Sequence, residues 1–146
     1  EEVPDEQVRQ IFDVNVFGAL RMIRAIAPHM REQRSGRIIN ISSIAGKLVT
    51  PVNGVYSATK FALEALSDAL RLELASFGVQ VIVVEPGAID THFEATAEAH
   101  TQDILSNFSS PYQQLYHLSD QFAASMHHQK TGPEIVSFFP PGVEKR

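Results

Sequence analysis

VQVIVVEPG, at residues 79–87, is a continuous apolar run that is stopped by Pro86-Gly87. Such a run suits a strand that is buried on both faces, as in a parallel sheet. Before it, residues 55–77 carry apolar side chains at helical spacing. RIINIS, at 37–42, is short and rich in isoleucine, which predicts another strand. Strand, helix and strand in this order predict a βαβ unit of an α/β fold.

The rest of the chain adds helices to this unit. Apolar residues spaced by three or four positions predict a long helix over 4–33, and segments 97–108 and 111–127 also have helical spacing. The sequence shows only two strands, and two parallel strands form a poor sheet by themselves. We therefore expect residues 1–146 to be a single partial domain, a piece of a larger α/β fold.

Composition and charge exclude several classes of function. The chain has 146 residues, 44% hydrophobic and 20% charged, as in a soluble globular protein. Its net charge of −5 argues against nucleic acid or an anionic membrane as the main partner. The absence of cysteine excludes disulfides and thiol catalysis. No apolar run reaches the ~20 residues of a membrane helix, and we expect a cytoplasmic protein.

Several titratable side chains are expected to lie on the surface rather than in a site. His127 and His128 are adjacent, so they point to different faces of a helix, and no carboxylate stands at ligand spacing beside them. We therefore expect no bound metal. Glu64, Asp68 and Glu73 follow one another along the helix over 55–77 and are expected to be surface charges.

Polar residues follow both predicted strands. The first strand ends in NISS at 40–43, and the second ends in EPG at 85–87. Ligands of open α/β sheets bind outside the carboxyl ends of the strands, and a parallel pair brings both ends to one edge. The connecting helix begins at that edge. Its first turn carries Tyr56 and Lys60, which should lie on one helical face beside Ser43.

A phenol beside an ammonium and a hydroxyl suggests acid–base chemistry. The ordinary tyrosine pKa is about 10, and an ammonium ~6 Å away at an effective dielectric of ~20 contributes about 3 kcal/mol, roughly two pKa units. Lys60 is therefore expected to lower the pKa of Tyr56. Ser43 could hold a carbonyl or alcohol oxygen while Tyr56 gives or takes its proton. The electrons would have to move as hydride, which implies a nicotinamide cofactor.

Four motifs resemble those of a known enzyme family. They are NISS at 40–43, YSATK at 56–60, PGAIDT at 86–91 and NVFG at 15–18, with Ser43 thirteen positions before Tyr56. Together they resemble the ordinary short branch of the short-chain dehydrogenases/reductases, which includes hydroxysteroid and retinol dehydrogenases. The resemblance covers residues 1–91. It implies a Rossmann-like, doubly wound parallel sheet and an NAD(P)-dependent oxidoreductase that interconverts a secondary alcohol and a ketone.

The resemblance also implies roles for individual residues. Tyr56 would be the acid/base, and Lys60 would lower its pKa and bind the nicotinamide ribose. Ser43 would orient the substrate oxygen, and Asn15 would hold a water that connects Lys60 to solvent. The residues implied to border the nicotinamide are Pro86, Gly87, Ile89 and Thr91, the last two at its carboxamide.

The sequence departs from the family's pattern before residue 1. The glycine-rich phosphate turn, the residue that selects NAD or NADP and the NAG segment are absent from these residues. The resemblance therefore implies the C-terminal catalytic part of the fold, with NAD or NADP as cofactor and no choice between them. We expect weak or no activity from the isolated chain, because it should lack the pyrophosphate site.

The resemblance further implies a substrate class and an assembly. Residues 88–131 resemble the variable substrate-binding segment, and their apolar content favours a small hydrophobic alcohol or ketone, such as a steroid, retinoid or acyl derivative. Helices 4–33 and 55–77 resemble those through which family members form homodimers or homotetramers. Two alternatives stay open. One is a sugar-nucleotide epimerase or dehydratase of the extended branch, which also carries YxxxK; the other is an inactive relative that serves as an oligomerisation module.

Overall fold

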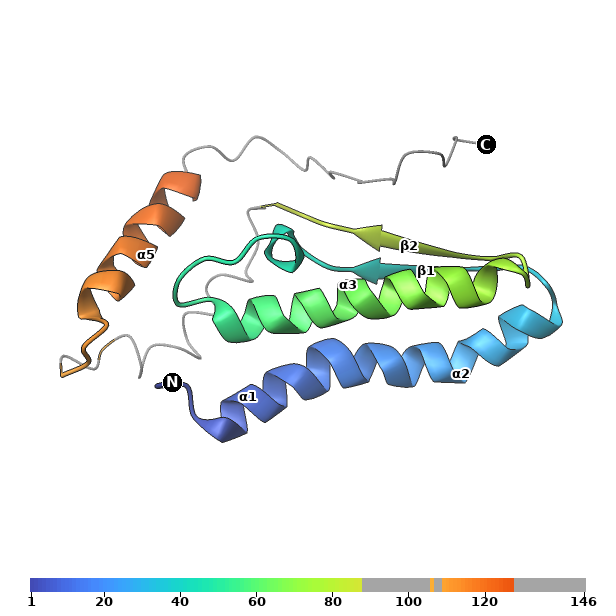
Figure 1. Ribbon diagram of the computed structural model, residues 1–146, viewed down its shortest axis with the longest axis horizontal. Helices are drawn as coiled ribbons and strands as arrows, with labels where there is room; N and C mark the ends of the chain where they lie inside the picture. Colours follow the sequence, from blue (N-terminus) through green and yellow to red (C-terminus); the bar gives the residue numbers. More distant parts are fainter. Residues whose placement is uncertain (88–105, 107–108, 128–146) are drawn as a thin grey trace.

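The computed structural model describes residues 1–87, 106 and 109–127. Its centre is a strand–helix–strand unit made of β1 (Gly36–Ile41), α3 (Gly54–Ala75) and β2 (Val79–Val84). The two strands are parallel neighbours and are paired over their whole length (Figure 1). The predicted order of elements is confirmed, and the described residues form part of a Rossmann-like α/β fold.

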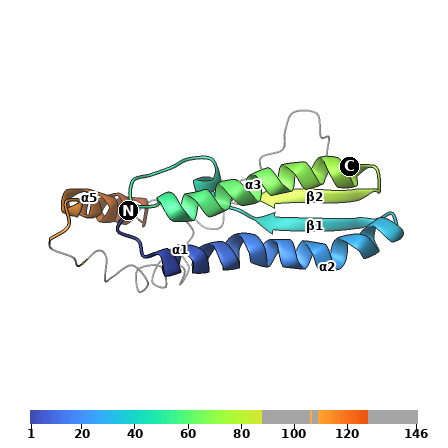
Figure 2. The same ribbon diagram turned by 60° about the horizontal axis from the view of Figure 1, so that its bottom comes forward.

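The long N-terminal helix predicted over 4–33 consists of three consecutive segments. They are α1 (Asp5–Phe12), the π-helical turn η1 (Asp13–Gly18) and α2 (Ala19–Glu32). In Figure 2 the three segments form one rod that runs along β1, while α3 runs along β2. A π-helical turn inside an α-helix is rare and is frequently found at functional sites, and this one contains Asn15.

Helices α2 and α3 cover one face of the sheet. The core there consists of Ile23, Ile38, Leu74, Val79 and Val81. On the opposite face, Ile39 and Ile41 are 54% and 55% exposed. In β2, buried residues alternate with more exposed ones. The predicted burial of this strand on both faces is therefore wrong for the described residues, because both packed helices lie on the same side.

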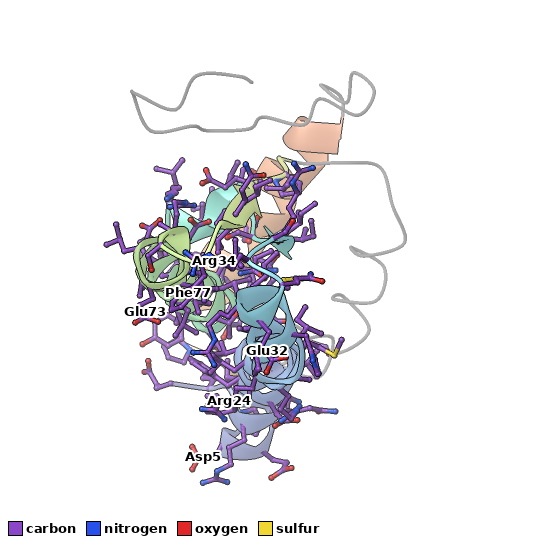
Figure 3. The ribbon with its side chains drawn as sticks, turned by 90° about the vertical axis from the view of Figure 1, so that its right-hand side faces the viewer. Asp5, Arg24, Glu32, Arg34, Glu73 and Phe77 are labelled. Atoms are coloured by element: carbon purple, nitrogen blue, oxygen red, sulfur yellow. The ribbon has the colours of Figure 1, made fainter. Side chains whose placement is uncertain are left out.

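At the edge where the strands begin, the ends of α2 and α3 lie side by side. The guanidinium of Arg34 donates a hydrogen bond to the carbonyl of Ser76 at 2.9 Å, close to Phe77 in Figure 3. Gly78 has a φ of +72°, and a Cβ there would lie 2.5 Å from the carbonyl oxygen of Arg34. Glycine therefore allows the close approach of the two loops, and the expected site lies at the other end of the sheet.

One further helix, α5 (Gln113–His127), lies beside the N-terminus in Figures 1 and 2. The hydroxyls of Tyr116 and Ser110 donate hydrogen bonds to the carboxylate of Glu2, the second at 2.7 Å. The helix predicted over 111–127 is confirmed, while the helix predicted over 97–108 lies outside the described residues apart from Ser106. None of the helices in the described part of the chain is long and apolar enough to cross a membrane.

Packing of α3 on the sheet should dominate stability. Leu74 is 5% exposed and lies in the core, so Leu74→Ala is expected to lower the free energy of unfolding by about 2–5 kcal/mol. The control is Glu73→Ala on the same helix, where the side chain is exposed and the change should stay within about 0.5 kcal/mol. Urea denaturation of the protein that contains these residues measures both, and equal losses would contradict the described packing.

Candidate active site

The two loops that follow the strands are joined by backbone hydrogen bonds. Ser42 N–H donates to the Val84 carbonyl at 2.7 Å, and Ile44 N–H donates to the Pro86 carbonyl at 3.1 Å. Ser43 has an extended backbone, and its Oγ accepts a hydrogen bond from the amide of Ala45 at 3.1 Å. This contact caps the short 3-10 turn η2 (Ile44–Gly46) and fixes the Ser43 side chain at the carboxyl edge of the sheet.

Tyr56 lies in the first turn of α3, where the helix begins beside this edge. Its phenol is half-buried and lies close enough to the Ser43 side chain for that hydroxyl to lower the pKa of the phenol. The βαβ connection therefore brings together two residues that the sequence separates by thirteen positions, as the strand-edge argument predicts.

Lys60 lies one helical turn beyond Tyr56, and its amine turns back toward the sheet. Its Nζ is 5.6 Å from the centre of the Tyr56 ring, in a cation–π position. The same amine donates a hydrogen bond to the carbonyl oxygen of Ile41 at 3.1 Å, at the last residue of β1. The ammonium is therefore held between the ring and the strand end.

The predicted lowering of the Tyr56 pKa by Lys60 is wrong in this structure. Burial raises the pKa of the Tyr56 phenol above its ordinary value, and the hydrogen bond with Ser43 opposes that effect in part. Burial also lowers the pKa of Lys60, while the nearby charge of Glu64 raises it. Desolvation dominates both groups because each is half-buried at the helix start. Tyr56 is therefore a neutral phenol at neutral pH, ready to donate a proton.

Asn15 reaches α3 through a threonine. Its Nδ2 donates to Oγ1 of Thr59 at 3.0 Å, and Thr59 in turn donates to the backbone carbonyl of Tyr56 at 2.7 Å. Thr59 is fully buried and directly precedes Lys60. The hydrogen bond thus fastens the π-helical turn to the helix that carries the site. Sequence reasoning missed Thr59, and the only available signal was its place inside YSATK.

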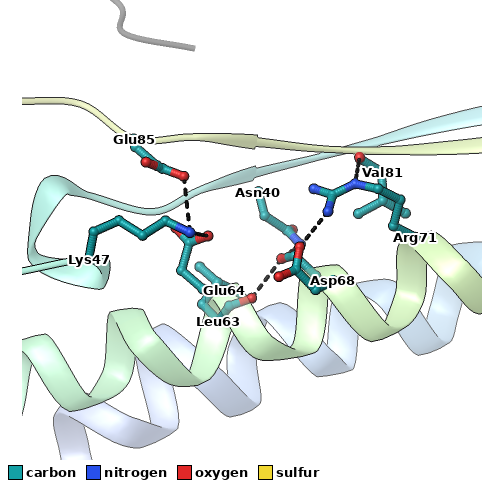
Figure 4. Close-up of polar contacts among 9 residues, drawn as sticks. Asn40, Lys47, Leu63, Glu64, Asp68, Arg71, Val81 and Glu85 are labelled. Carbon is teal, nitrogen blue, oxygen red and sulfur yellow. Dashed lines mark hydrogen bonds and ion pairs between the residues drawn. The ribbon is translucent and has the colours of Figure 1, made fainter. Parts of the chain in front are cut away.

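Glu64 is another residue that sequence reasoning misplaced. The sequence predicts a surface charge, but Glu64 is 6% exposed and forms an ion pair with Lys47. The distance between Lys47 Nζ and Glu64 Oε2 is 3.0 Å. The expectation holds for Asp68, which is exposed and pairs with Arg71 on the surface. Glu64 differs because the loop that contains Lys47 folds over it (Figure 4).

The residues expected to border a nicotinamide are only partly described. Pro86 and Gly87 follow β2 at the same edge and are partly exposed. A Cβ on Gly87 would meet no atom within 4 Å among the described residues, so there is open space beside it. Ile89 and Thr91 lie outside the described residues.

Comparisons with known proteins bear on the family and the fold of this chain. The family model described as short chain dehydrogenase matches residues 1–102. An uncharacterized oxidoreductase of Schizosaccharomyces pombe is 48% identical over 93 residues, which are 64% of this chain and 39% of that protein. A 3-oxoacyl-(acyl-carrier protein) reductase from Brucella melitensis, solved with bound NAD, is 39% identical with a TM-score of 0.60; the match covers 66% of this chain and 37% of that one. A gluconate 5-dehydrogenase from Burkholderia cenocepacia, solved with NADP and tartrate, is 28% identical with a TM-score of 0.62, over 71% of this chain and 42% of that one.

The family match covers the strands, the helices packed on them and the site edge. The chain spans less than half the length of the curated relatives and solved structures named above. The family match nevertheless takes in most of this chain, including all of the described βαβ unit. The chain therefore belongs to the short chain dehydrogenase family.

Proposed function

We propose that the protein containing this chain is an NAD(P)-dependent oxidoreductase that interconverts a secondary alcohol and a ketone. The observation that carries the proposal is the meeting of Ser43, Tyr56 and Lys60 at the carboxyl edge of a parallel sheet, with Lys60 Nζ 5.6 Å from the centre of the Tyr56 ring and Ser43 acting on the Tyr56 phenol. Ligands of such sheets bind at this edge. The NAD and NADP in the two solved relatives support either cofactor and do not choose between them.

The chemistry that bound NAD or NADP supplies is hydride transfer to or from the substrate carbon. In ketone reduction the Ser43 hydroxyl holds the substrate oxygen, and Tyr56 donates its phenolic proton to that oxygen as the carbon gains hydride. In alcohol oxidation the phenolate form of Tyr56 takes the hydroxyl proton instead. Because the phenol is neutral at neutral pH, Tyr56 already carries the proton that ketone reduction requires.

The other site residues have supporting roles in the proposal. Lys60 binds the nicotinamide ribose and places positive charge near the Tyr56 oxygen. Asn15 is fastened to α3 through Thr59 and holds a water that connects Lys60 to solvent. The residues proposed to border the nicotinamide are Pro86, Gly87, Ile89 and Thr91.

A hydrophobic substrate and a symmetric assembly extend the proposal. The relative that reduces 3-oxoacyl groups supports an acyl-like ketone, with residues 88–131 as the substrate-binding segment.

Large apolar side chains are exposed on α2 and α3, which supports a homodimer or homotetramer through helices 4–33 and 55–77. They include Met22, Ile26, Phe61 and Leu72.

A substrate screen tests the proposal. The protein that contains these residues is assayed with NADH and NADPH against ketones, including 3-oxoacyl thioesters, and against sugar nucleotides. Cofactor oxidation with a ketone supports the proposal. Conversion of a sugar nucleotide without net cofactor oxidation would favour the epimerase or dehydratase alternative. No turnover with any substrate would favour an inactive relative.

The Ser43 hydroxyl should set the pH dependence of alcohol oxidation. Because this side chain lowers the pKa of Tyr56, Ser43→Ala is expected to raise the apparent pKa of the rising limb, as the phenolate then forms only at higher pH. The rate below that limb should fall by about 10-fold for each unit of the shift. Ser57→Ala, which removes a buried hydroxyl one position from Tyr56, is the control and should leave the limb in place. Coincident profiles for Ser43→Ala and Ser57→Ala would contradict the role given to Ser43.

A further inference from the structure

Three charged side chains behind the site form a bridge between separate segments. Lys47 lies in the loop after η2, and its Nζ is 3.0 Å from Oε2 of Glu64 and 3.5 Å from Oε1 of Glu85 (Figure 4). Glu64 belongs to α3, and Glu85 directly follows β2. The bridge therefore ties the loop that carries Ser43 to the helix that carries Tyr56 and to the end of the second strand.

Gly46 makes room for the buried carboxylate. A Cβ on Gly46 would lie 2.7 Å from Oγ of Ser42 and 3.0 Å from Cγ of Glu64, so only glycine fits without a shift. Within the described residues, Ser42 Oγ and Glu64 Oε1 are buried and have no hydrogen-bond partner. Burial of a charged pair is weak evidence for stability, because the cost of removing the charges from water offsets their attraction. The arrangement is better explained by what it positions.

The bridge also lies next to the amine of the site. Glu64 follows Lys60 by one helical turn, and its negative charge raises the pKa of Lys60 against the effect of burial. Hydrogen bonding to Glu64 likewise raises the pKa of Lys47. Tyr56 and Glu64 of its own helix thus act on Lys60, while Lys47 and Glu85 from the two loops complete the bridge on the far side of Glu64.

We propose that Glu64 is a positioning residue that acts through Lys47: it holds the Ser43 loop on the Tyr56 helix and places negative charge beside Lys60. This inference rests on the proposed oxidoreductase function. Glu64 does not touch the reacting atoms in this role. It fixes the distance between a hydroxyl on one segment and a phenol on another, which backbone hydrogen bonds between the loops alone do not determine.

The test compares two acidic residues of the same helix. Glu64→Gln is expected to lower kcat for ketone reduction roughly 10- to 100-fold with KM nearly unchanged, the effect of displacing a reacting group by about 1 Å. Asp68→Asn, one turn further along and exposed, should leave kcat unchanged. Both variants are made in the protein that contains this chain, and circular dichroism checks that they fold. Equal kcat values in the two variants would overturn the proposal.

The pH profile of ketone reduction distinguishes an electrostatic effect of Glu64 on Lys60 from a purely structural role of the ion pair. In Glu64→Gln the alkaline limb should move to lower pH, because Lys60 loses the charge that favours its ammonium form. In Lys47→Met the limb should move the other way or stay, because Glu64 keeps its charge and loses its cation. If the ion pair were purely structural, Glu64→Gln and Lys47→Met would shift the alkaline limb in the same direction, or neither variant would shift it. Either result would overturn the electrostatic part of the proposal.

A second pair of variants keeps the proposal testable if Glu64→Gln does not fold. Lys47→Arg retains a cation at the bridge and should keep kcat within about twofold, whereas Lys47→Met should lose roughly 10- to 100-fold. Wild-type activity in Lys47→Met would overturn the inference alone. An inactive wild-type protein, or full activity in Tyr56→Phe, would overturn the proposed function and this inference with it.

Discussion

Tyr56→Phe is expected to lower the rate of hydride transfer by about 10²- to 10⁴-fold, the usual contribution of a positioned general acid or base. The change removes one oxygen and leaves the ring that packs beneath Lys60, so cofactor affinity should change little. Single-turnover measurement of NADH or NADPH oxidation with a reducible ketone separates the chemical step from binding.

The control for this prediction removes another hydroxyl from the same helix. Ser57 directly follows Tyr56, and its side chain is 1% exposed, so Ser57→Ala should leave the rate of hydride transfer unchanged. If Tyr56→Phe and Ser57→Ala both transfer hydride at the wild-type rate, Tyr56 is not the acid.

Lys60→Met is expected to lower kcat/KM by about 10²-fold or more, a loss of the size seen when one preorganised charge or donor is removed. The physical reason is that Lys60 is the ammonium over the Tyr56 ring, and it also donates to the Ile41 carbonyl at 3.1 Å. The proposed contact with the nicotinamide ribose adds a loss of cofactor affinity. Fluorescence titration with NADH or NADPH measures that affinity, and steady-state kinetics measure kcat.

An exposed cation supplies the control for Lys60. Arg9 on α1 pairs with Asp5 at 3.2 Å on the surface, so Arg9→Met removes a positive charge without touching the site. Equal losses in Lys60→Met and Arg9→Met would show that net charge, rather than the position of Lys60, explains the effect.

Much of the fold could be predicted because its signals are local. The apolar run at 79–84 and the helical spacing over 54–75 each depend on neighbouring residues, and the parallel pairing of β1 and β2 follows from their order. The same logic placed Ser43 beside Tyr56, because both residues lie at ends of elements that meet at one edge.

The parts that could not be predicted depend on contacts between distant segments. The direction of the Tyr56 pKa shift depends on burial, which spacing along a helix does not reveal. The burial of Glu64 depends on a loop that closes over it where Gly46 leaves space. The contact of Asn15 with Thr59 joins residues forty-four positions apart.

The most direct measurement is a double-mutant cycle of Ser43→Ala and Tyr56→Phe on the single-turnover rate of hydride transfer. If the hydroxyl and the phenol act as one unit on the same oxygen, the double variant should be about as slow as Tyr56→Phe alone. Losses that multiply would mean that the two groups act independently, and that result would contradict the shared acid–base site.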